Sequence, residues 1–263
     1  MSFSGKTLGF LGLIGLSCIG SQAVAADWDA KDKIDYHTRL LDGCDGGSGA
    51  WVNYWRSSGE GGMMMVDGAL LPGFPERHAR VTSTGTAGVY RDMTPLMPAS
   101  DERLTLWVAF AAKAEGAPYD ASGDEASFQL RGSDNTEWIT VGVMGRLNEW
   151  RLRLVGDGQY KIFSDGAGRR PDNQADEIVL RIDIDLRPGS KDSVALWLNP
   201  KAGSAPGLKD ATILLNDADL WKPGSSVSIS RLRVGLINAQ QQEQKGFSLS
   251  NVRMATSYAA TLQ

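Results

Sequence analysis

SVALWLNP at residues 193–200 and SRLRVGLI at residues 230–237 carry the pattern that decides the fold. Apolar residues occupy every second position in both stretches, as Val194, Leu196 and Leu198 do in the first. Successive side chains of a β-strand point to opposite faces, whereas a helix repeats every 3.6 residues. The alternation therefore predicts strands with one buried face and one face turned away from the core.

Similar strand patterns recur from Trp51 to Ser257, with Gly, Pro, Asp or Asn between most of them. Ser133–Asn135 and Asp157–Gly158 have the composition of hairpin turns. One short helix is predicted at residues 34–41. The clearest predicted strands are residues 104–112, 127–131, 137–143, 149–155, 160–163, 178–187, 194–199, 227–237 and 246–256. This organisation predicts an all-β fold of two packed antiparallel sheets.

Residues 1–26 have the layout of an export signal. Lys6 precedes an apolar run of about 14 residues, and small residues follow at 23–25. That run is shorter than the roughly 20 residues needed to cross a bilayer. We therefore expect cleavage, a periplasmic or extracellular location, no membrane insertion afterwards, and one jelly-roll domain over residues 27–263.

Composition narrows the class of partner and excludes an internal disulfide. The chain has 27 basic and 31 acidic residues, for a net charge of −4. This mildly acidic balance argues against nucleic-acid binding. Cys44 is the only cysteine after the signal, so the mature chain cannot form an intramolecular disulfide.

Several phrases together resemble the bacterial laminin-G-like, or concanavalin A-like, jelly-roll domains of secreted proteins. The resemblance covers nearly the whole mature chain and implies two curved antiparallel sheets with a glycan or cell-surface partner. It fixes no activity, because this fold hosts lectins, glycoside hydrolases, lyases and adhesion modules. The matching phrases are GGSGAWVNYW at 46–55, GVYRDM at 88–93, TLWVAFAAK at 105–113, SVALWLNP at 193–200 and SNVRMATSY at 250–258.

The resemblance also raises the question of a structural calcium ion. Some related domains use an acidic residue near the closing strand for calcium, but Ser250 stands there in this chain. The loop with Asp42, Asp45 and Ser48 is rich in oxygen atoms, which calcium prefers. Asp42 and Asp45 are thus weak calcium candidates, and an ordinary polar turn explains the same residues.

IVLRIDIDLR at residues 178–187 places two carboxylates on the face opposite its apolar residues. Jelly-roll glycoside hydrolases use acids at alternate strand positions, which makes Asp183 and Asp185 weak catalytic candidates. Arg181 and Arg187 flank them and favour their ionised form, whereas a general acid needs a raised pKa. Cross-strand charge pairing on a solvated face explains the same alternation.

The faces opposite the apolar residues suggest a ligand site. Arginine forks bind carboxylate or sulfate groups, and an aromatic plane stacks on a sugar ring, so this set predicts an acidic polysaccharide or cell-surface glycan as partner. A solvated sheet with a packed tryptophan is the simpler alternative. The predicted ligand-binding residues are Trp197, Asn199, Arg131, Arg151, Arg153 and Arg181, and Gln129, Asp183, Asp185 and Arg187 share the outward positions.

Three functions remain open from the sequence. The first is a non-catalytic glycan-binding or surface-binding protein, and the second is a polysaccharide hydrolase or lyase acting through Asp183 and Asp185. The third is a structural envelope or matrix protein. His37 and His78 lack the partner residues of a metal site or nucleophilic triad in the sequence, so no cofactor is predicted beyond the calcium candidate.

Overall fold

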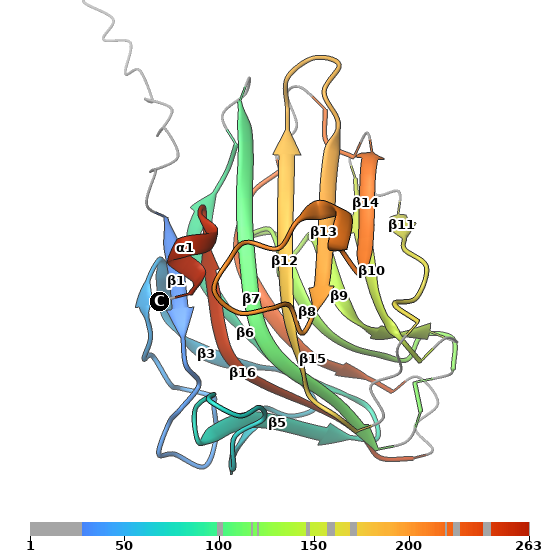
Figure 1. Cartoon of the computed structure of the whole chain (residues 1–263). Coiled ribbons are helices and arrows are strands. Elements are labelled where there is room, and N and C mark those ends of the chain that lie inside the picture. Colours follow the sequence, from blue (N-terminus) through green and yellow to red (C-terminus); the bar gives the residue numbers. More distant parts are fainter. Residues whose placement is uncertain are drawn as a thin grey trace, which may run out of the picture.

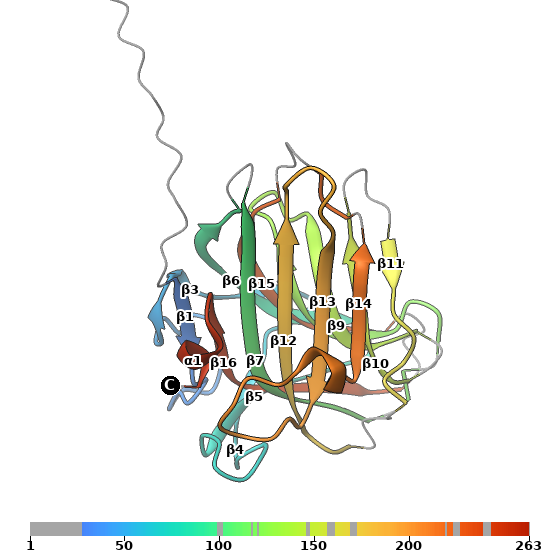
Figure 2. The same cartoon turned by 45° about the horizontal axis from the view of Figure 1, so that its top comes forward.

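The computed structural model describes residues 28–98, 102–116, 118–119, 121–145, 148–156, 161–168, 173–218, 220–222, 227–238 and 243–262. The predicted export signal at residues 1–26 and the predicted turn at 157–158 lie outside these ranges. The strands form two antiparallel sheets, seen as two layers in Figures 1 and 2, where β7, β12 and β13 stand in front of β8 and β9. The predicted jelly-roll sandwich is confirmed.

Sheet A contains nine strands. Its main order is β14-β13-β12-β7-β16-β1-β2, while β5 pairs with β16 and β4 pairs with β5. Its strands are β1 (Asp29–Asp32), β2 (Ser48–Gly49), β4 (Met64–Asp67), β5 (Arg77–Ser83), β7 (Arg103–Gly116), β12 (Asp176–Asp185), β13 (Asp192–Leu198), β14 (Ile213–Ala218) and β16 (Lys245–Ala255).

Sheet B contains seven strands in the order β11-β10-β9-β8-β15-β6-β3. A 3₁₀ turn, η3 (Leu208–Asp210), and a short helix, α1 (Tyr258–Thr261), lie outside the sheets. Within the described ranges, no helix has the length and apolar character required to cross a membrane. The strands of sheet B are β3 (Trp51–Gly59), β6 (Thr86–Leu96), β8 (Glu125–Arg131), β9 (Glu137–Met144), β10 (Trp150–Val155), β11 (Lys161–Phe163) and β15 (Ile229–Ile237).

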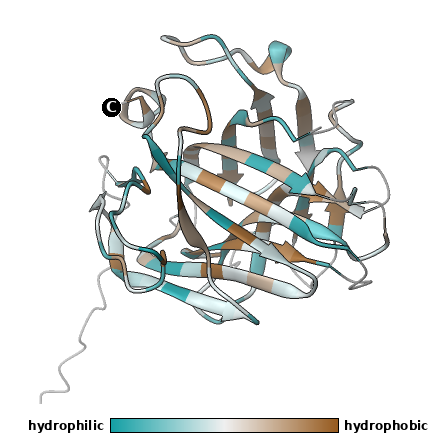
Figure 3. Cartoon of the chain, turned by 90° about the horizontal axis from the view of Figure 1, so that it is seen from below, coloured by the Kyte–Doolittle hydropathy of each residue, from teal (hydrophilic) through white to brown (hydrophobic). Residues whose placement is uncertain are grey.

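The core lies between the two sheets and contains the alternating apolar residues. Phe110 of β7 stacks on Phe128 of β8 with ring centroids 4.2 Å apart, so aromatic contact joins the sheets at this point. Val194 and Leu196 of β13 and Val234 of β15 are fully buried. Figure 3 shows hydrophobic and hydrophilic residues alternating along the strands, as expected when only one face of each sheet is buried.

The nine clearest predicted strands correspond to β7–β13, β15 and β16, but the predicted helix at residues 34–41 is wrong. Ile34 has a φ of +53°, which is incompatible with a right-handed helix. Its backbone N–H donates to the carboxylate of Asp32 at 2.8 Å, which holds the segment in an irregular turn. The predicted hairpin at 133–135 is confirmed, since Asn135 has a φ of +69° between β8 and β9.

Candidate functional site

Sheet B presents two cross-strand rows on its outer face, the side turned away from the core. The alternation that buries Leu232 and Val234 in β15 turns the neighbouring Arg233 and Gly235 outward. The strand registers then place one outward residue of each strand in line. The polar row is Arg56, Tyr90, Arg233, Gln129, Thr140, Arg153 and Phe163, and the small-residue row beside it is Ser58, Gly88, Gly235, Ser127 and Gly142.

The small-residue row requires glycine at three of its positions because the backbone of the paired strand lies too close for a Cβ. A Cβ added to Gly88 would lie 2.3 Å from the carbonyl oxygen of Val234, and one added to Gly235 would lie 2.4 Å from that of Ala87. A Cβ on Gly142 would make a backbone contact of 2.3 Å as well. Across its five strands the row spans roughly 19 Å, at about 4.8 Å per strand. The row forms a track with no side chain larger than serine, and its members Gly88, Gly235, Ser127 and Gly142 are buried.

The outer face of sheet B is basic although the whole chain is acidic. Arg91 of β6 points into the core and does not contribute to the charge of this face. The chain carries a net charge of −4, whereas the outward strand residues of this sheet include seven cations and three anions. The cations are Arg56, Arg131, Arg151, Arg153, Lys161, Arg231 and Arg233, and the anions are Asp92, Glu125 and Glu137. The face therefore attracts anions.

A network at Glu125 fixes part of the polar row. Arg153 donates to Glu137 at 2.5 Å and to Glu125 at 2.6 Å, while Ser127 and Gln129 donate to Glu125 at 2.5 and 2.6 Å. Burial alone would raise the pKa of Glu125, but the charge and hydrogen bond of Arg153 and the other donors outweigh it and lower the pKa. Glu125 is thus a carboxylate at neutral pH, held as a fixed acceptor.

Aromatic and guanidinium groups alternate at the β3 edge of the face. The Arg56 guanidinium lies 5.2 Å from the Tyr54 ring centroid and 6.0 Å from that of Tyr90. The Arg231 guanidinium lies 4.6 Å from the centroid of the same Tyr90 ring, and Arg231 donates to Asp92 at 2.6 Å. Tyr54 is 47% exposed, so its ring is available for stacking on a ligand.

The β11 edge has a second exposed aromatic residue beside an arginine. Phe163 is 48% exposed, and the Arg151 guanidinium lies 5.6 Å from its ring centroid. Arg151 also donates twice to the carbonyl oxygen of Ser164, at 3.0 and 2.7 Å, which fixes the guanidinium plane. The face therefore offers an aromatic ring at each of its two edges.

The six predicted ligand-binding residues do not share one face. Arg131, Arg151 and Arg153 lie together on the outer face of sheet B. Arg181 of β12 and Trp197 of β13 belong to sheet A, and Asn199 follows β13, so the assumption of a single face is wrong. Alternation determines which side of its own strand a residue occupies, but it carries no information about which sheet the strand joins.

The Trp197 side chain is buried by its neighbours and is not exposed to a ligand. It is 2% exposed, stacks on Trp107 with ring centroids 5.9 Å apart, and donates from Nε1 to the carbonyl oxygen of Gly207. In Figure 1 the segment after β13 crosses in front of β12 and β13. Asn199 has a φ of +51°, and its side chain bonds to Asp176 and to the backbone of Glu177. Both residues therefore have structural roles.

The catalytic candidates Asp183 and Asp185 also lie on sheet A, where arginines neutralise them. Burial would raise the pKa of Asp183, but hydrogen bonds from Thr105 and Arg103 and the charge of Arg181 outweigh it and lower the pKa. The hydrogen bond from Arg187 is the main cause that lowers the pKa of Asp185 to about 2. Neither group holds a proton at neutral pH, so neither is suited to act as a general acid.

The loop of the calcium candidates is organised around a guanidinium group. Arg91, only 2% exposed, donates to the carbonyl oxygens of Asp45, Gly46 and Asn53 and to the carboxylate of Asp32. The Asp42 carboxylate accepts the backbone N–H of Ser57 at 2.9 Å. Within the ranges that the structure describes, no group of three or more His, Cys, Asp or Glu residues is arranged to hold a metal ion.

We expect a chelator to leave the thermal unfolding of the purified chain unchanged, because the Arg91 guanidinium already supplies positive charge to this loop. The measurement is a melting curve in excess EDTA and a second in excess calcium chloride. A calcium-dependent rise in melting temperature that is lost in Asp42→Asn and Asp45→Asn would contradict this expectation and establish a calcium site.

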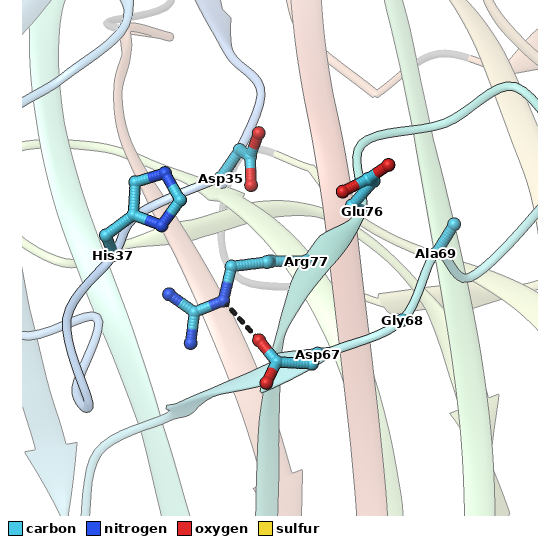
Figure 4. Close-up of a pocket in the computed structure, with 7 residues that line it drawn as sticks. All are labelled: Asp35, His37, Asp67, Gly68, Ala69, Glu76 and Arg77. Carbon is cyan, nitrogen blue, oxygen red and sulfur yellow. Dashed lines mark hydrogen bonds and ion pairs between the residues drawn. The ribbon is translucent and has the colours of Figure 1, made fainter.

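A cavity of about 740 Å³ lies away from the outer face of sheet B. Figure 4 shows Asp35, His37, Asp67, Glu76 and Arg77 around it, with Arg77 donating to Asp67 at 2.8 Å. These residues are mostly exposed, and the arginine pairs with a carboxylate that is 89% exposed. Such a solvated charge cluster carries little binding energy.

Sequence reasoning missed several residues of the site, although part of their signal was available. The alternation in residues 230–237 that identified Leu232 and Val234 as buried also turns Arg231 and Arg233 outward. Tyr90 has the same alternating signal in β6. Tyr54 and Phe163 lie in a bulged strand and in a three-residue strand, where no regular pattern places them.

No protein-family model matches the sequence, and no curated protein matches it. Solved structures share the fold. The endo-β-1,4-glucuronan lyase from the fungus Trichoderma reesei superposes with a TM-score of 0.55 over 79% of this chain and 92% of that chain, at 13% identity. Lectin I from Ulex europaeus, in complex with the methyl glycoside of α-L-fucose, superposes with a TM-score of 0.50 at 11% identity. The superposition covers 88% of this chain and 98% of the lectin. The binding domain of botulinum neurotoxin serotype C1 superposes with a TM-score of 0.52 at 7% identity. The superposition covers 88% of this chain and 49% of that chain. These likenesses show the jelly-roll, concanavalin A-like fold.

Proposed function

We propose that this chain is an exported carbohydrate-binding protein that holds an acidic polysaccharide against the outer face of sheet B. The observation that carries the proposal is the excess of seven cations over three anions on that face of an acidic protein. Electrostatic attraction of a polyanion requires such a local excess of cations. The laminin-G-like assignment and the periplasmic or extracellular location are part of the same proposal.

The shape of the face suits a linear polymer laid across the strands. Sugar rings would lie over the small-residue row, which extends for roughly 19 Å and whose Gly88, Gly235, Ser127 and Gly142 are themselves buried. The arginines of the polar row beside it supply hydrogen-bond donors. Tyr54 at one edge and Phe163 at the other offer apolar planes for the faces of sugar rings. Two of the proteins with a similar fold are named for sugar chemistry, the glucuronan lyase and the fucoside-bound lectin, which supports a glycan partner.

We expect the purified chain of residues 27–263 to bind acidic polysaccharides and to bind neutral ones more weakly. Binding should weaken as salt rises, since the Debye length falls from about 30 Å at 0.01 M to about 10 Å at 0.1 M. Isothermal titration with oligosaccharides of increasing length should show affinity rising until the track is filled. Arg151→Ala and Phe163→Ala should each weaken binding about threefold to tenfold.

The alternatives give different results in the same experiment. Release of unsaturated sugar from an acidic polysaccharide, followed by absorbance, would identify a lyase, and release of reducing ends alone would identify a hydrolase. Self-association with no bound glycan would favour a structural envelope or matrix protein. Failure to bind any polysaccharide on a broad array would overturn the proposal.

A further inference from the structure

Two arginines on the outer face of sheet B, Arg131 and Arg233, combine the lack of a carboxylate partner with one shared hydrogen-bond acceptor. Within the part of the chain that the structure describes, Arg56 and Arg151 also form no ion pair, but they do not share an acceptor. Arg153 pairs with Glu125 and Glu137, and Arg231 pairs with Asp92. Among the described residues, no carboxylate lies within ion-pair distance of Arg131 of β8 or Arg233 of β15. Glu125 and Glu137 act on these two guanidinium groups only from beyond ion-pair distance, so their positive charges are only partly compensated within the fold.

Both guanidinium groups converge on one amide oxygen. Gln129 Oε1 accepts from Arg131 Nη1 at 2.9 Å and from Arg233 Nη1 at 3.4 Å. The amide orientation is fixed, because Gln129 Nε2 donates to the buried Glu125 carboxylate at 2.6 Å. Gln129 thus positions the two cations next to each other, although like charges repel and a neutral oxygen compensates them only partly.

Each of these guanidinium groups has donors left for a ligand. A guanidinium carries five N–H donors. The contacts of Arg131 with Asn135 and Gln129 use two, as do the contacts of Arg233 with Ser58 and Gln129. Partial burial lowers the pKa of both arginines, which shows that desolvation works against their charge. An anion bound between them would relieve both the desolvation and the repulsion.

We propose that Arg131 and Arg233, both hydrogen-bonded to Gln129, bind the carboxylate group of a uronic acid residue. The proposal rests on the proposed function and names the substrate class, a polyuronate. Planar carboxylates match the forked donors of a guanidinium. Two guanidinium groups beside the same amide oxygen can donate to both oxygens of one carboxylate. Because Gly235 and Ser127 lie one cross-strand row away, the sugar ring of that residue would lie on the small-residue row.

The test compares arginine variants on a polyuronate and on its neutral counterpart. The probes are polygalacturonate, the same polymer after carboxyl reduction, and dextran sulfate, each titrated calorimetrically. Arg131→Gln and Arg233→Gln should each weaken polygalacturonate binding about tenfold or more, the value of a charge-assisted hydrogen bond. Binding to the carboxyl-reduced polymer should be unchanged. The matched control is Arg187→Gln, which removes an exposed arginine just after β12 and should change affinity less than twofold.

Two further variants separate the proposed contact from a structural role. Arg233→Lys keeps the charge but not the fork, so it should recover only part of the affinity. The double variant Arg131→Gln/Arg233→Gln should lose less than the product of the two single losses, because both residues contact one carboxylate. Circular dichroism of each variant checks that the fold is intact before titration.

Each outcome bears on one of the two proposals. If the wild-type chain binds polygalacturonate while Arg131→Gln and Arg233→Gln behave like Arg187→Gln, the carboxylate site is overturned and the proposed function stands. Equal losses on dextran sulfate and polygalacturonate would overturn selectivity for a carboxylate. If the wild-type chain binds no probe and no other glycan, the proposed function itself fails.

Discussion

Replacing Arg91 by methionine is expected to lower the free energy of unfolding by about 3–5 kcal/mol, the usual cost of removing one partner of a buried ion pair. Arg91 and Asp32 are each 2% exposed and lie 2.7 Å apart. Arg91 belongs to sheet B and Asp32 to sheet A, so the pair joins the two sheets at one end of the sandwich. Methionine leaves the Asp32 carboxylate without its cation.

The loss should be large because the two residues anchor several other groups. Asp32 also accepts from Tyr36 at 2.6 Å and from Trp55 Nε1 at 2.9 Å, while Arg91 donates to two carbonyl oxygens of the loop before β2. The Arg91 guanidinium lies 4.9 Å from the Trp51 ring centroid and 5.9 Å from that of Trp55. Removing it therefore disturbs hydrogen bonds and aromatic packing together.

Urea unfolding followed by tryptophan fluorescence measures this effect. For a chain of this length, the expected loss corresponds to a fall in melting temperature of about 6–20 °C. The control is Lys31→Gln, which breaks a partly exposed ion pair with Asp29 and should cost less than about 1 kcal/mol. Equal stability of Arg91→Met and wild type would mean that water or a rearranged loop neutralises Asp32.

The fold could be predicted from the sequence because its evidence is local. Alternation over a few residues identified the strands and the buried sides of Val194 and Val234, and Asn135 marked a turn. The GVYRDM phrase placed Arg91 on the same side as Val89 and Met93, so a buried charge was visible in principle. Its partner Asp32 is 59 residues away, and no local pattern identifies it.

The candidate site could be predicted only in part because it depends on long-range pairing. Arg131, Arg151 and Arg153 were predicted to share a face and do so, since β8, β9 and β10 follow one another along the chain and pair in that order. Arg233 reaches the same face from β15, which inserts between β8 and β6. That insertion is a property of the whole topology, so alternation within residues 230–237 could not reveal it.

Replacing Trp197 by alanine is expected to destabilise the fold by about 3–5 kcal/mol, as large core truncations do, and to leave glycan affinity per folded molecule unchanged. The sequence alone predicted the opposite, a ligand-stacking residue. The structure gives the reason for the reversal: Trp197 packs with Trp107, Ala109 and Val179 on the outer side of sheet A. Partly buried Tyr258 of α1 lies against this cluster.

Two variants with opposite expected effects separate stability from glycan affinity. Phe163→Ala removes an exposed ring from sheet B, so stability should change by no more than about 0.5 kcal/mol while glycan affinity falls. Trp197→Ala should show the reverse, and Trp197→Phe should restore most of the lost stability by keeping an aromatic plane beside Trp107. Affinities are corrected for the folded fraction of each variant. Loss of glycan binding by Trp197→Ala at full stability would return the ligand site to sheet A, because only direct contact with the sugar could then account for the residue's effect.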